Sequence, residues 1–392
     1  MQPLDGITIV DLTRVLSGPY CTMLLADMGA RVIKIEQPGK GDDTRHWGPP
    51  FVEGESAYFL SINRNKESVT LDFKAMEGRV ALEQLIAKAD VLVENFRPGT
   101  LAKLGLDYAT LASRHPRLVY CSISGFGQTG PRKNEPGYDA VMQAEGGLMS
   151  ITGAADGPPY RLGVAISDIV SGMFAAQGIA MALFARERTG RGQLVDIGML
   201  DSVAALLSYQ AAIYFITGAA PGRMGNRHPT IVPYQTFGTA DGEFVLAVGN
   251  DEQWRKFCGV AGIEPAERFA TNRQRVVQHG EIERTIAEKL RAHPRRYWIE
   301  RLTEAGVPCG SVRDLHEVFT DPQLAARDMI AVVEHAAVGP LRLLGVPVKL
   351  SDTPARVRAA PPTLGQHTSA VLCGDLGMTN QTVADLRARG VI

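Results

Sequence analysis

ITIVDLTRVLSGPYCTMLLADMGARVIKIE, residues 7–36, contains two short apolar runs on either side of a helix-forming segment. The runs Ile7–Leu12 and Arg31–Glu36 have the length and the β-branched content of strands. Between them, Pro19 stands where a helix begins and Gly29 where it ends, the usual placement of these residues at helix termini. A strand, a helix and a second strand in this order predict a parallel β-sheet.

The alternation of apolar runs with amphipathic segments continues along the chain. Further strands are expected at Ser68–Phe73, Asp90–Glu94, Leu118–Ser124 and Leu194–Ile197, with helices at Met76–Lys88, Thr100–Lys103 and Gly137–Gly147, from Ile169 onward and at Leu200–Thr217. This pattern predicts an α/β fold with a doubly wound parallel sheet.

The composition of the sequence changes at Gly218, after which Gly, Pro, Arg and Asn are frequent and apolar residues no longer recur periodically. We therefore expect a large domain at residues 1–217, a linker and a smaller α/β domain at 218–325, and a C-terminal segment at 326–392 that returns to the large domain. In that last segment a strand is expected at Leu341–Val348, and no helical stretch long enough to fold alone before Gln381.

Composition excludes several classes of function. The chain of 392 residues has a net charge of −1 and a pI near 6.7, which gives no attraction to nucleic acid or to an anionic membrane. Its five cysteines are scattered without a CxxC pair, which argues against a disulfide framework and a zinc knuckle and fits a reducing, cytoplasmic location. Two long apolar stretches, Val164–Phe184 and Met199–Ile216, each contain an Asp, so we expect buried helices rather than membrane spans.

Basic residues follow several of the predicted strands. In a parallel sheet, ligands bind beyond the carboxyl ends of the strands. The basic residues at these strand ends are Lys40, Lys74, Arg97 and Lys103. Each of them alone is typical of a solvated surface, but together they favour a phosphate-bearing ligand.

A literal GxGxxG occurs at Gly125–Gly130, directly after a predicted strand. The dinucleotide-binding motif requires a helix to begin inside the glycine run. Here Pro131 and Pro136 follow instead, so no helix dipole is available for a pyrophosphate. We expect this segment to be a loop that lines the ligand cleft. The sequence contains no metal-binding motif either.

Asp168 stands in the segment RLGVAISDIVSG, residues 161–172, among apolar and small residues. A carboxylate in such surroundings costs free energy unless something compensates. One hypothesis is that Ser167 or Asp168 caps the helix that begins there. The other is that Asp168 is a nucleophilic carboxylate directed into a cleft.

The chain resembles the class III CoA-transferases, the family of formyl-CoA transferase, carnitine CoA-transferase and succinate–hydroxymethylglutarate CoA-transferase. The resemblance covers essentially the whole chain. The segments that carry it include GARVIKIE (29–36), NRNK (63–66), VENFRPG (93–99), SGFG (124–127), Asp168 in its frame, TGRGQ (189–193), PCG (308–310) and LGQHT (364–368). Together with this last segment, IVPYQTF (231–237) is closest to the branch that uses dicarboxylic acids.

The resemblance implies an interlocked homodimer of chains with a large Rossmann-like domain and a small domain, and it implies that Asp168 is the nucleophile. It implies an aspartyl-CoA thioester intermediate in the transfer of CoA from a succinyl-CoA-like donor to a carboxylic acid, with no metal or further cofactor. It places CoA against Leu16, Ser17, Gln37, Leu71, Asp72, Phe73, Lys74, Asn95, Phe96, Arg97, Lys103, Pro136, Gly137, Tyr138 and Asp139.

Some positions depart from formyl-CoA transferase. That enzyme has different residues at positions 16 and 17, arginines in place of Gln37 and Lys103, and a lysine in place of Pro136. Its glycine-rich loop in the small domain has no counterpart in this sequence. These departures count against a formate–oxalate substrate pair.

Two other functions are compatible with the same fold. A 2-methylacyl-CoA racemase needs two bases, and the histidine of the racemases is replaced here by Tyr138, a poor base at neutral pH. A CoA-binding protein without catalysis would have no need of Asp168. A distal substrate carboxylate has five candidate partners, namely Arg45, His46, Arg223, Arg227 and His228.

Overall fold

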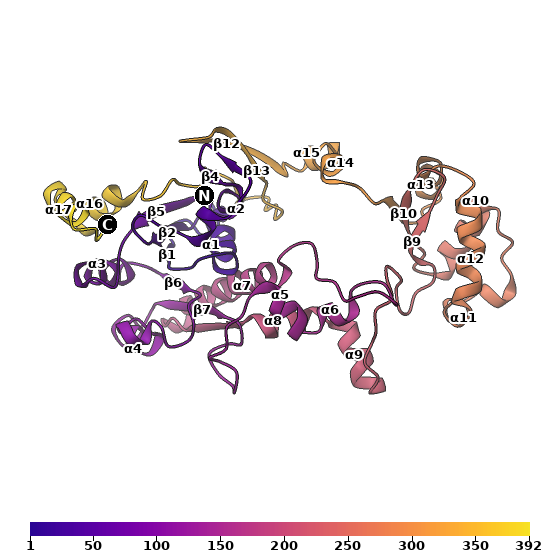
Figure 1. Ribbon diagram of the computed structural model, residues 1–392, viewed down its shortest axis with the longest axis horizontal. Coiled ribbons are helices and arrows are strands. Elements are labelled where there is room, and N and C mark those ends of the chain that lie inside the picture. The colour runs from indigo at the N-terminus through magenta and orange to yellow at the C-terminus, as the bar shows by residue number, and fades with distance from the viewer. The chain divides into compact units, whose positions relative to one another are not determined.

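The computed structural model describes residues 1–392, which form two compact units. The first unit comprises Met1–Leu148, Arg161–Ile216 and Pro322–Ile392, and the second comprises Met149–Tyr160 and Thr217–Asp321. The first unit has an α/β fold around a six-stranded sheet in the order β5-β2-β1-β6-β7-β8 (Figure 1). All its strand pairs are parallel, as the sequence predicted. The strands are β1 (Thr8–Asp11), β2 (Arg31–Glu36), β5 (Lys66–Thr70), β6 (Val91–Glu94), β7 (Val119–Ser124) and β8 (Leu194–Gly198).

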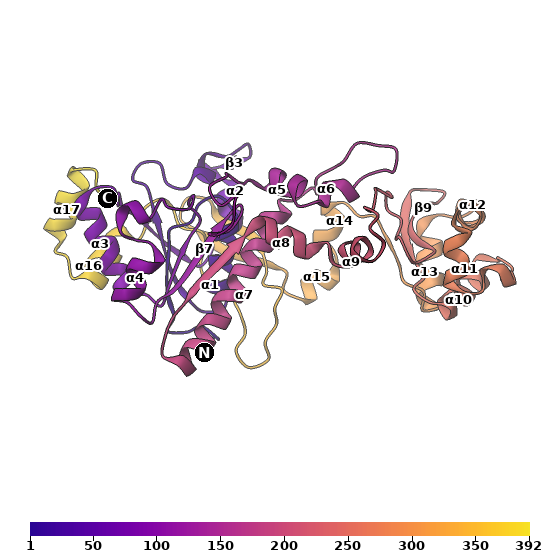
Figure 2. The same ribbon diagram turned by 90° about the horizontal axis from the view of Figure 1, so that it is seen from below.

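Helices cover both faces of this sheet, and each face has its own apolar core (Figure 2). One face carries α1 (Ser17–Asp27), α5 (Asp139–Glu145), α7 (Ile166–Thr189) and α8 (Met199–Leu206). The other carries α3 (Met76–Ala87), α4 (Tyr108–Arg114), α16 (Thr368–Leu376) and α17 (Asn380–Ala388). Strands β1, β6 and β7 are almost fully buried between the two layers, which explains why both of their faces are largely apolar, whereas β8 is only partly buried.

The chain has further short elements outside the six-stranded sheet and the helices that cover it. They are η1 (Asp43–His46), β3 (Phe51–Val52), β4 (Glu55–Ser56), α2 (Ala57–Ile62), η2 (Ala102–Leu104), α6 (Leu148–Ile151), α9 (Ser208–Thr217), α15 (Pro322–Ala326), β12 (Ile330–His335) and β13 (Gly339–Leu344).

The second unit is built on a three-stranded antiparallel sheet in the order β11-β10-β9. Helices pack on it around a core that includes Trp254, Phe257 and Phe244. Its elements are β9 (Tyr234–Gly238), β10 (Glu243–Ala247), α10 (Asp251–Ala261), η3 (Glu267–Phe269), α11 (Asn272–Val277), α12 (His279–Leu290), α13 (Arg295–Glu304), β11 (Cys309–Ser311) and α14 (Leu315–Phe319).

Two expectations about single elements were wrong, and one helix was missed. The third strand is β5, which begins at Lys66, because this lysine is buried against Asp11 and so fits inside a strand despite its charge. The segment after Met199 is two helices bent by 77°, and the second, α9, is exposed rather than buried. In the C-terminal segment, α16 precedes Gln381, and its sequence, TSAVLCGDL, has too few turns to show a clear helical period.

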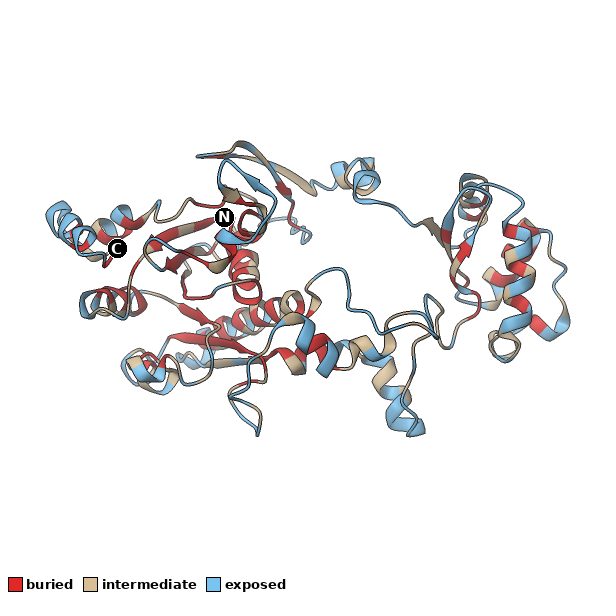
Figure 3. Cartoon of the chain, in the orientation of Figure 1, coloured by how far each residue is buried: buried red, intermediate tan, exposed pale blue.

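Helix α7 is the one helix long and apolar enough to span a membrane by length and composition. It packs against α1, α5, α8 and the strands β7 and β8, and the side that faces the sheet is buried (Figure 3). The apolar sequence is explained by this packing.

Candidate active site

Asp168 lies in the first turn of α7, but it does not cap the helix. The cap is supplied by Asp139, whose Oδ1 accepts hydrogen bonds from the Ser167 N–H at 3.0 Å and from the Ser167 Oγ at 2.7 Å. The N-cap residue of α7 is Ala165, whose side chain cannot accept a hydrogen bond. The capping hypothesis for Ser167 or Asp168 is therefore wrong, and the Asp168 carboxylate is free for another role.

The Asp168 carboxylate lines a cavity of about 160 Å³ and forms no ion pair. The groups that favour its ionised form are the hydroxyl and the backbone N–H of Ser17. Burial, and then the nearby negative charge of Asp139, raise the pKa of Asp168 to about 7, while the hydroxyl and N–H of Ser17 oppose this rise. A carboxylate with this pKa changes between its neutral and charged forms close to physiological pH.

Ser17 reaches Asp168 because α1 and α7 pack closely. The carbonyl O of Ser17 lies against Gly172, where a Cβ would come within 2.6 Å of it, so only glycine permits this approach. Ser17 is the first residue of α1, and Leu16 before it offers no side-chain cap. Two helix N-termini thus meet at Asp168, and their partial positive charges favour the ionised carboxylate.

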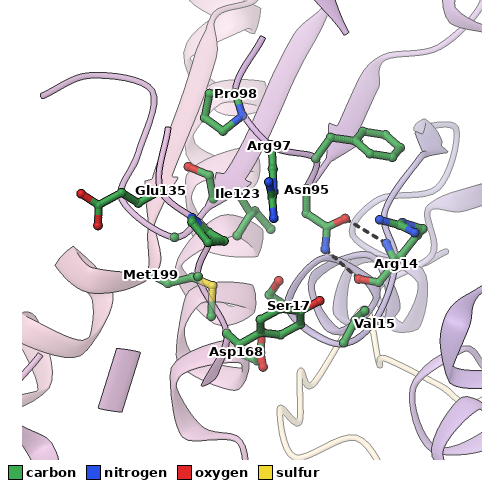
Figure 4. A pocket seen from close by; sticks show the side chains of 16 residues that line it. Arg14, Val15, Ser17, Asn95, Arg97, Pro98, Ile123, Glu135, Asp168 and Met199 are labelled. Atoms are coloured by element: carbon green, nitrogen blue, oxygen red, sulfur yellow. Dashed lines mark hydrogen bonds between the residues drawn. The ribbon is translucent and has the colours of Figure 1, made fainter. Parts of the chain in front are cut away.

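The loop before Ser17 is held by Asn95, which follows β6. The Asn95 Oδ1 accepts the Arg14 N–H at 2.9 Å, and the Asn95 Nδ2 donates to the Arg14 carbonyl O at 2.7 Å (Figure 4). From the same segment Arg97 extends into the space that Asp168 and Ser17 enter from the opposite side (Figure 4). The carboxyl ends of β1 and β6 therefore supply one wall of the cavity.

The lining of this cavity also contains two glycines. Gly125 and Gly137 both line the cavity, and a Cβ on Gly125 would lie 2.9 Å from the Gly137 Cα. No helix begins in the GxGxxG segment, and the next one, α5, begins only at Asp139. The prediction that no helix begins in this motif is confirmed.

A second cavity, of about 400 Å³, adjoins the first, because Arg14 and Phe96 line both. Lys40, Lys74 and Lys103 stand around it. Lys40 is paired with Asp43 at 2.8 Å, whereas Lys74 and Lys103 are exposed and form no ion pair. Cations without a carboxylate partner at the mouth of a cavity suit an anionic ligand.

Most of the residues implied by the resemblance lie around these two cavities. Those lining the first are Ser17, Asn95, Phe96, Arg97, Pro136, Gly137, Tyr138 and Asp168. Those lining the second are Gln37, Phe73, Lys74, Phe96 and Lys103. Four residues line neither: Leu16 and Leu71 are buried in apolar clusters, Asp72 bonds the Lys74 N–H, and Asp139 caps α7.

Several lining residues were not among those expected. Arg14 follows β1 and Ser124 ends β7. Both could have been predicted, because ligands bind at the carboxyl ends of parallel strands. Met199 begins α8 and also lines the cavity, but nothing in the sequence marks it. No histidine lines this cavity.

The five candidates for a distal carboxylate have different surroundings. Arg45 is buried and its Nε donates to Glu36 at 2.8 Å, so its role is structural. His46 contacts the carbonyl O of Lys40, and Arg223 donates to that of Gly157. His228 stacks on Tyr234. Arg227 lines a cavity of about 330 Å³ within the second unit, where its Nη1 lies 3.1 Å from the His279 Nδ1.

Comparison with known proteins agrees with this geometry. A model of CoA-transferase family III matches residues 4–368. A succinate–glutarate CoA-transferase of Agrobacterium fabrum is 43% identical over 94% of this chain and 95% of its own length. The human succinyl-CoA:glutarate CoA-transferase is 40% identical over 100% of this chain and 90% of its own length. Among solved structures, a CAIB/BAIF family protein from Brucella suis matches with a TM-score of 0.85 and 42% identity, over 95% of this chain and 99% of that one.

Proposed function

The chain belongs to CoA-transferase family III and is a class III CoA-transferase, and from this premise we propose that Asp168 is the nucleophile that receives the acyl group and then CoA. The observation behind the proposal is a carboxylate that lines a cavity, forms no ion pair, and has its ionised form favoured by the hydroxyl and N–H of Ser17. An ion-paired carboxylate would be a weak nucleophile, whereas this one is available when deprotonated.

The reaction conserves the thioester bond through four displacements. The Asp168 carboxylate attacks the donor thioester carbonyl, forming a mixed anhydride and releasing CoA thiolate. The thiolate attacks the aspartyl carbonyl, giving an aspartyl-CoA thioester and the free donor acid. The acceptor carboxylate then attacks this thioester to form a second anhydride, and the thiolate finally attacks the acceptor carbonyl to release the new acyl-CoA and regenerate Asp168. Each step is easier than direct exchange between two carboxylates.

In this scheme Ser17 also stabilises negative charge that develops during the reaction. When thiolate attacks the aspartyl carbonyl, negative charge develops on a carboxyl oxygen of Asp168, and the hydroxyl and N–H of Ser17 already favour negative charge on this group. Preorganised donors at such an oxygen lower the barrier. Backbone N–H groups of the Gly125–Gly130 loop and those that follow Asp168 are further candidates for stabilising the anhydride oxyanions.

CoA binding is assigned to the two adjoining cavities. The unpaired cations Lys74 and Lys103 support a location for the nucleotide phosphates in the second cavity. The contribution of Arg14 and Phe96 to both cavities supports a path for the pantetheine arm toward Asp168. We also propose that the other residues implied by the resemblance either contact CoA or hold residues that contact it. They include Leu16, Leu71, Asp72 and Asp139.

We further propose a dicarboxylic donor such as succinyl-CoA and a carboxylic acid acceptor, because the named relatives are transferases of succinate and glutarate. A homodimer is supported by the exposed apolar side chains of α9, where Phe215 is 79% and Ile216 84% exposed. The scattered free cysteines support a cytoplasmic location.

The test is to trap the covalent intermediate. The enzyme is incubated with succinyl-CoA and hydroxylamine, which attacks an acylated carboxyl group. We expect donor-dependent inactivation and a mass change on the peptide that contains Asp168, and CoA without an acyl group serves as the control. A panel of mono- and dicarboxylic acids in the same assay identifies the acceptor. Loss of activity that does not depend on the donor, or an unmodified peptide, contradicts the covalent mechanism.

The pH dependence of exchange reports the charge near Asp168. Only the ionised carboxylate is a nucleophile, so the rate is expected to fall below about pH 7, the pKa of Asp168. Asp139→Asn removes the negative charge that raises this pKa, so the acidic limb moves to lower pH. Asparagine still accepts the Ser167 N–H, so α7 stays capped. The measurement is kcat from pH 5 to 9 for both proteins, and coincident profiles contradict the prediction.

A further inference from the structure

A strained residue lies in the loop that leads to Ser17. Val15 has a backbone φ of +70°, in the left-handed region that β-branched residues rarely adopt. Such a conformation is disfavoured roughly tenfold to a hundredfold unless surrounding contacts stabilise it. Because Val15 is two residues before Ser17, its conformation sets the direction in which the chain enters α1.

Asp42 provides a contact that stabilises Val15. Its Oδ1 accepts the Val15 N–H at 3.2 Å, and its Oδ2 accepts from the Lys34 Nζ at 2.9 Å. The Lys34 Nζ also donates to the carbonyl O of Thr13 at 2.8 Å. Asp42 is 1% exposed and Lys34 is 0% exposed. The buried pair therefore holds the loop at two backbone positions, Thr13 and Val15.

Asp42 is itself firmly anchored. Its Oδ1 accepts from the N–H of Thr44 at 3.0 Å and from its Oγ1 at 2.8 Å, and its own N–H donates to the Glu36 Oε2 at 2.9 Å. Burial alone would raise the pKa of Asp42, but the charge of Lys34 and the bonds from Thr44 lower it to about 2. The carboxylate is ionised at neutral pH, and hydrogen bonds to an ionised acceptor are among the stronger ones.

We propose that Asp42, together with Lys34, is a positioning residue for the transfer reaction: it keeps Val15 in the left-handed conformation and so directs the donors of Ser17 at Asp168. The inference rests on the proposed role of Asp168 as nucleophile. A hydrogen bond to a charged acceptor contributes about as much as the strain at Val15 costs. Without Asp42, the loop is expected to leave this conformation for most of the time.

The test uses the fact that glycine adopts a positive φ without strain. Asp42→Ala is expected to lower kcat roughly tenfold to a hundredfold, in proportion to the disfavoured population of the loop. Asp42→Asn keeps an acceptor for Val15 and is expected to lose less. Adding Val15→Gly to each is expected to recover kcat to within about threefold of the Val15→Gly protein, because glycine no longer needs the bond. The rescue distinguishes positioning from a general loss of stability.

Asp27→Asn is the matched control. Asp27 is also buried, pairs with Arg64 at 2.7 Å and ends α1 at its far terminus, so its loss destabilises the fold without touching the loop. Val15→Gly is expected to give no recovery in that background. If Asp42→Ala does not fold, as judged by its melting temperature, the test is made with Asp42→Asn, alone and combined with Val15→Gly.

Two outcomes overturn the proposal: folded Asp42 variants that acylate Asp168 at the wild-type rate, or variants with lost activity that Val15→Gly leaves unchanged. The hydroxylamine-trapped adduct is measured in wild type in parallel. If wild type forms no adduct, the proposed nucleophile is wrong; if it forms one and the rescue fails, only the role of Asp42 is wrong.

Discussion

Replacing Asp168 with asparagine is expected to abolish CoA transfer, with kcat lower by about 10⁴-fold or more, as when the nucleophile of other covalent enzymes is removed. The amide has nearly the same shape as the carboxylate but cannot attack a thioester carbonyl. CoA binding is expected to stay within about threefold, because the cations assigned to its phosphates lie around the other cavity. The measurements are acyl exchange between succinyl-CoA and a carboxylic acid and CoA affinity by calorimetry.

Asp352→Asn is the control, since it makes the same chemical change on an exposed residue outside both cavities. Exchange by Asp168→Asn at near the wild-type rate contradicts the mechanism. Fast exchange of the α-proton of a 2-methylacyl-CoA into deuterated water by wild type would instead indicate racemase chemistry.

The same substitution is expected to stabilise the folded protein at alkaline pH. The pKa of Asp168 is about 7 in the folded state, whereas the ordinary pKa of an aspartate is 3.8, so folding disfavours the ionised form. This cost is absent below pH 3.8, grows as pH rises toward 7 and is constant above it. The interval between the two pKa values corresponds to at most about 4 kcal/mol at pH 8. Asparagine has no charge and escapes the cost.

Melting temperatures of wild type and Asp168→Asn from pH 4.5 to pH 8.5 test this expectation. The variant is expected to melt a few degrees higher at pH 8 and at nearly the same temperature at the lowest pH. Asp352→Asn is expected to show no pH-dependent difference. A constant difference at all pH values, or a less stable variant at pH 8, contradicts the view that Asp168 is kept at an energetic cost for its function.

The sequence predicted the sheet well because strands carry a local signal. The run around Ile9 is largely apolar on both faces, and the chain buries both faces of this strand between helices. The third strand was misplaced because Lys66 is charged, and its buried partners make the position acceptable: Asp11, the Pro19 carbonyl O and the Asn63 Oδ1. Helix α16 was missed because nine residues show too little of a helical period.

The candidate site was predictable where it depended on chain position. Lys74, Asn95 and Arg97 follow strands, and parallel strands bring their carboxyl ends to one edge of the sheet. The segment that contains Asp168 was conspicuous because a carboxylate stood among small and apolar residues. Sequence reasoning left open whether this carboxylate caps α7, since capping depends on which distant acceptor reaches the helix.

The amino-acid sequence by itself determined the α/β class, the parallel sheet and the family, because these follow from local periodicity and from motifs spread along the chain. Only the tertiary structure decided that Asp139 caps α7, that Ser17 lies where it favours the ionised form of Asp168, and that Asp42 holds Val15. Each of these contacts joins residues of different elements, and their hydrogen-bond geometry depends on how helices and strands pack. The spacing of residues along the chain does not specify that geometry.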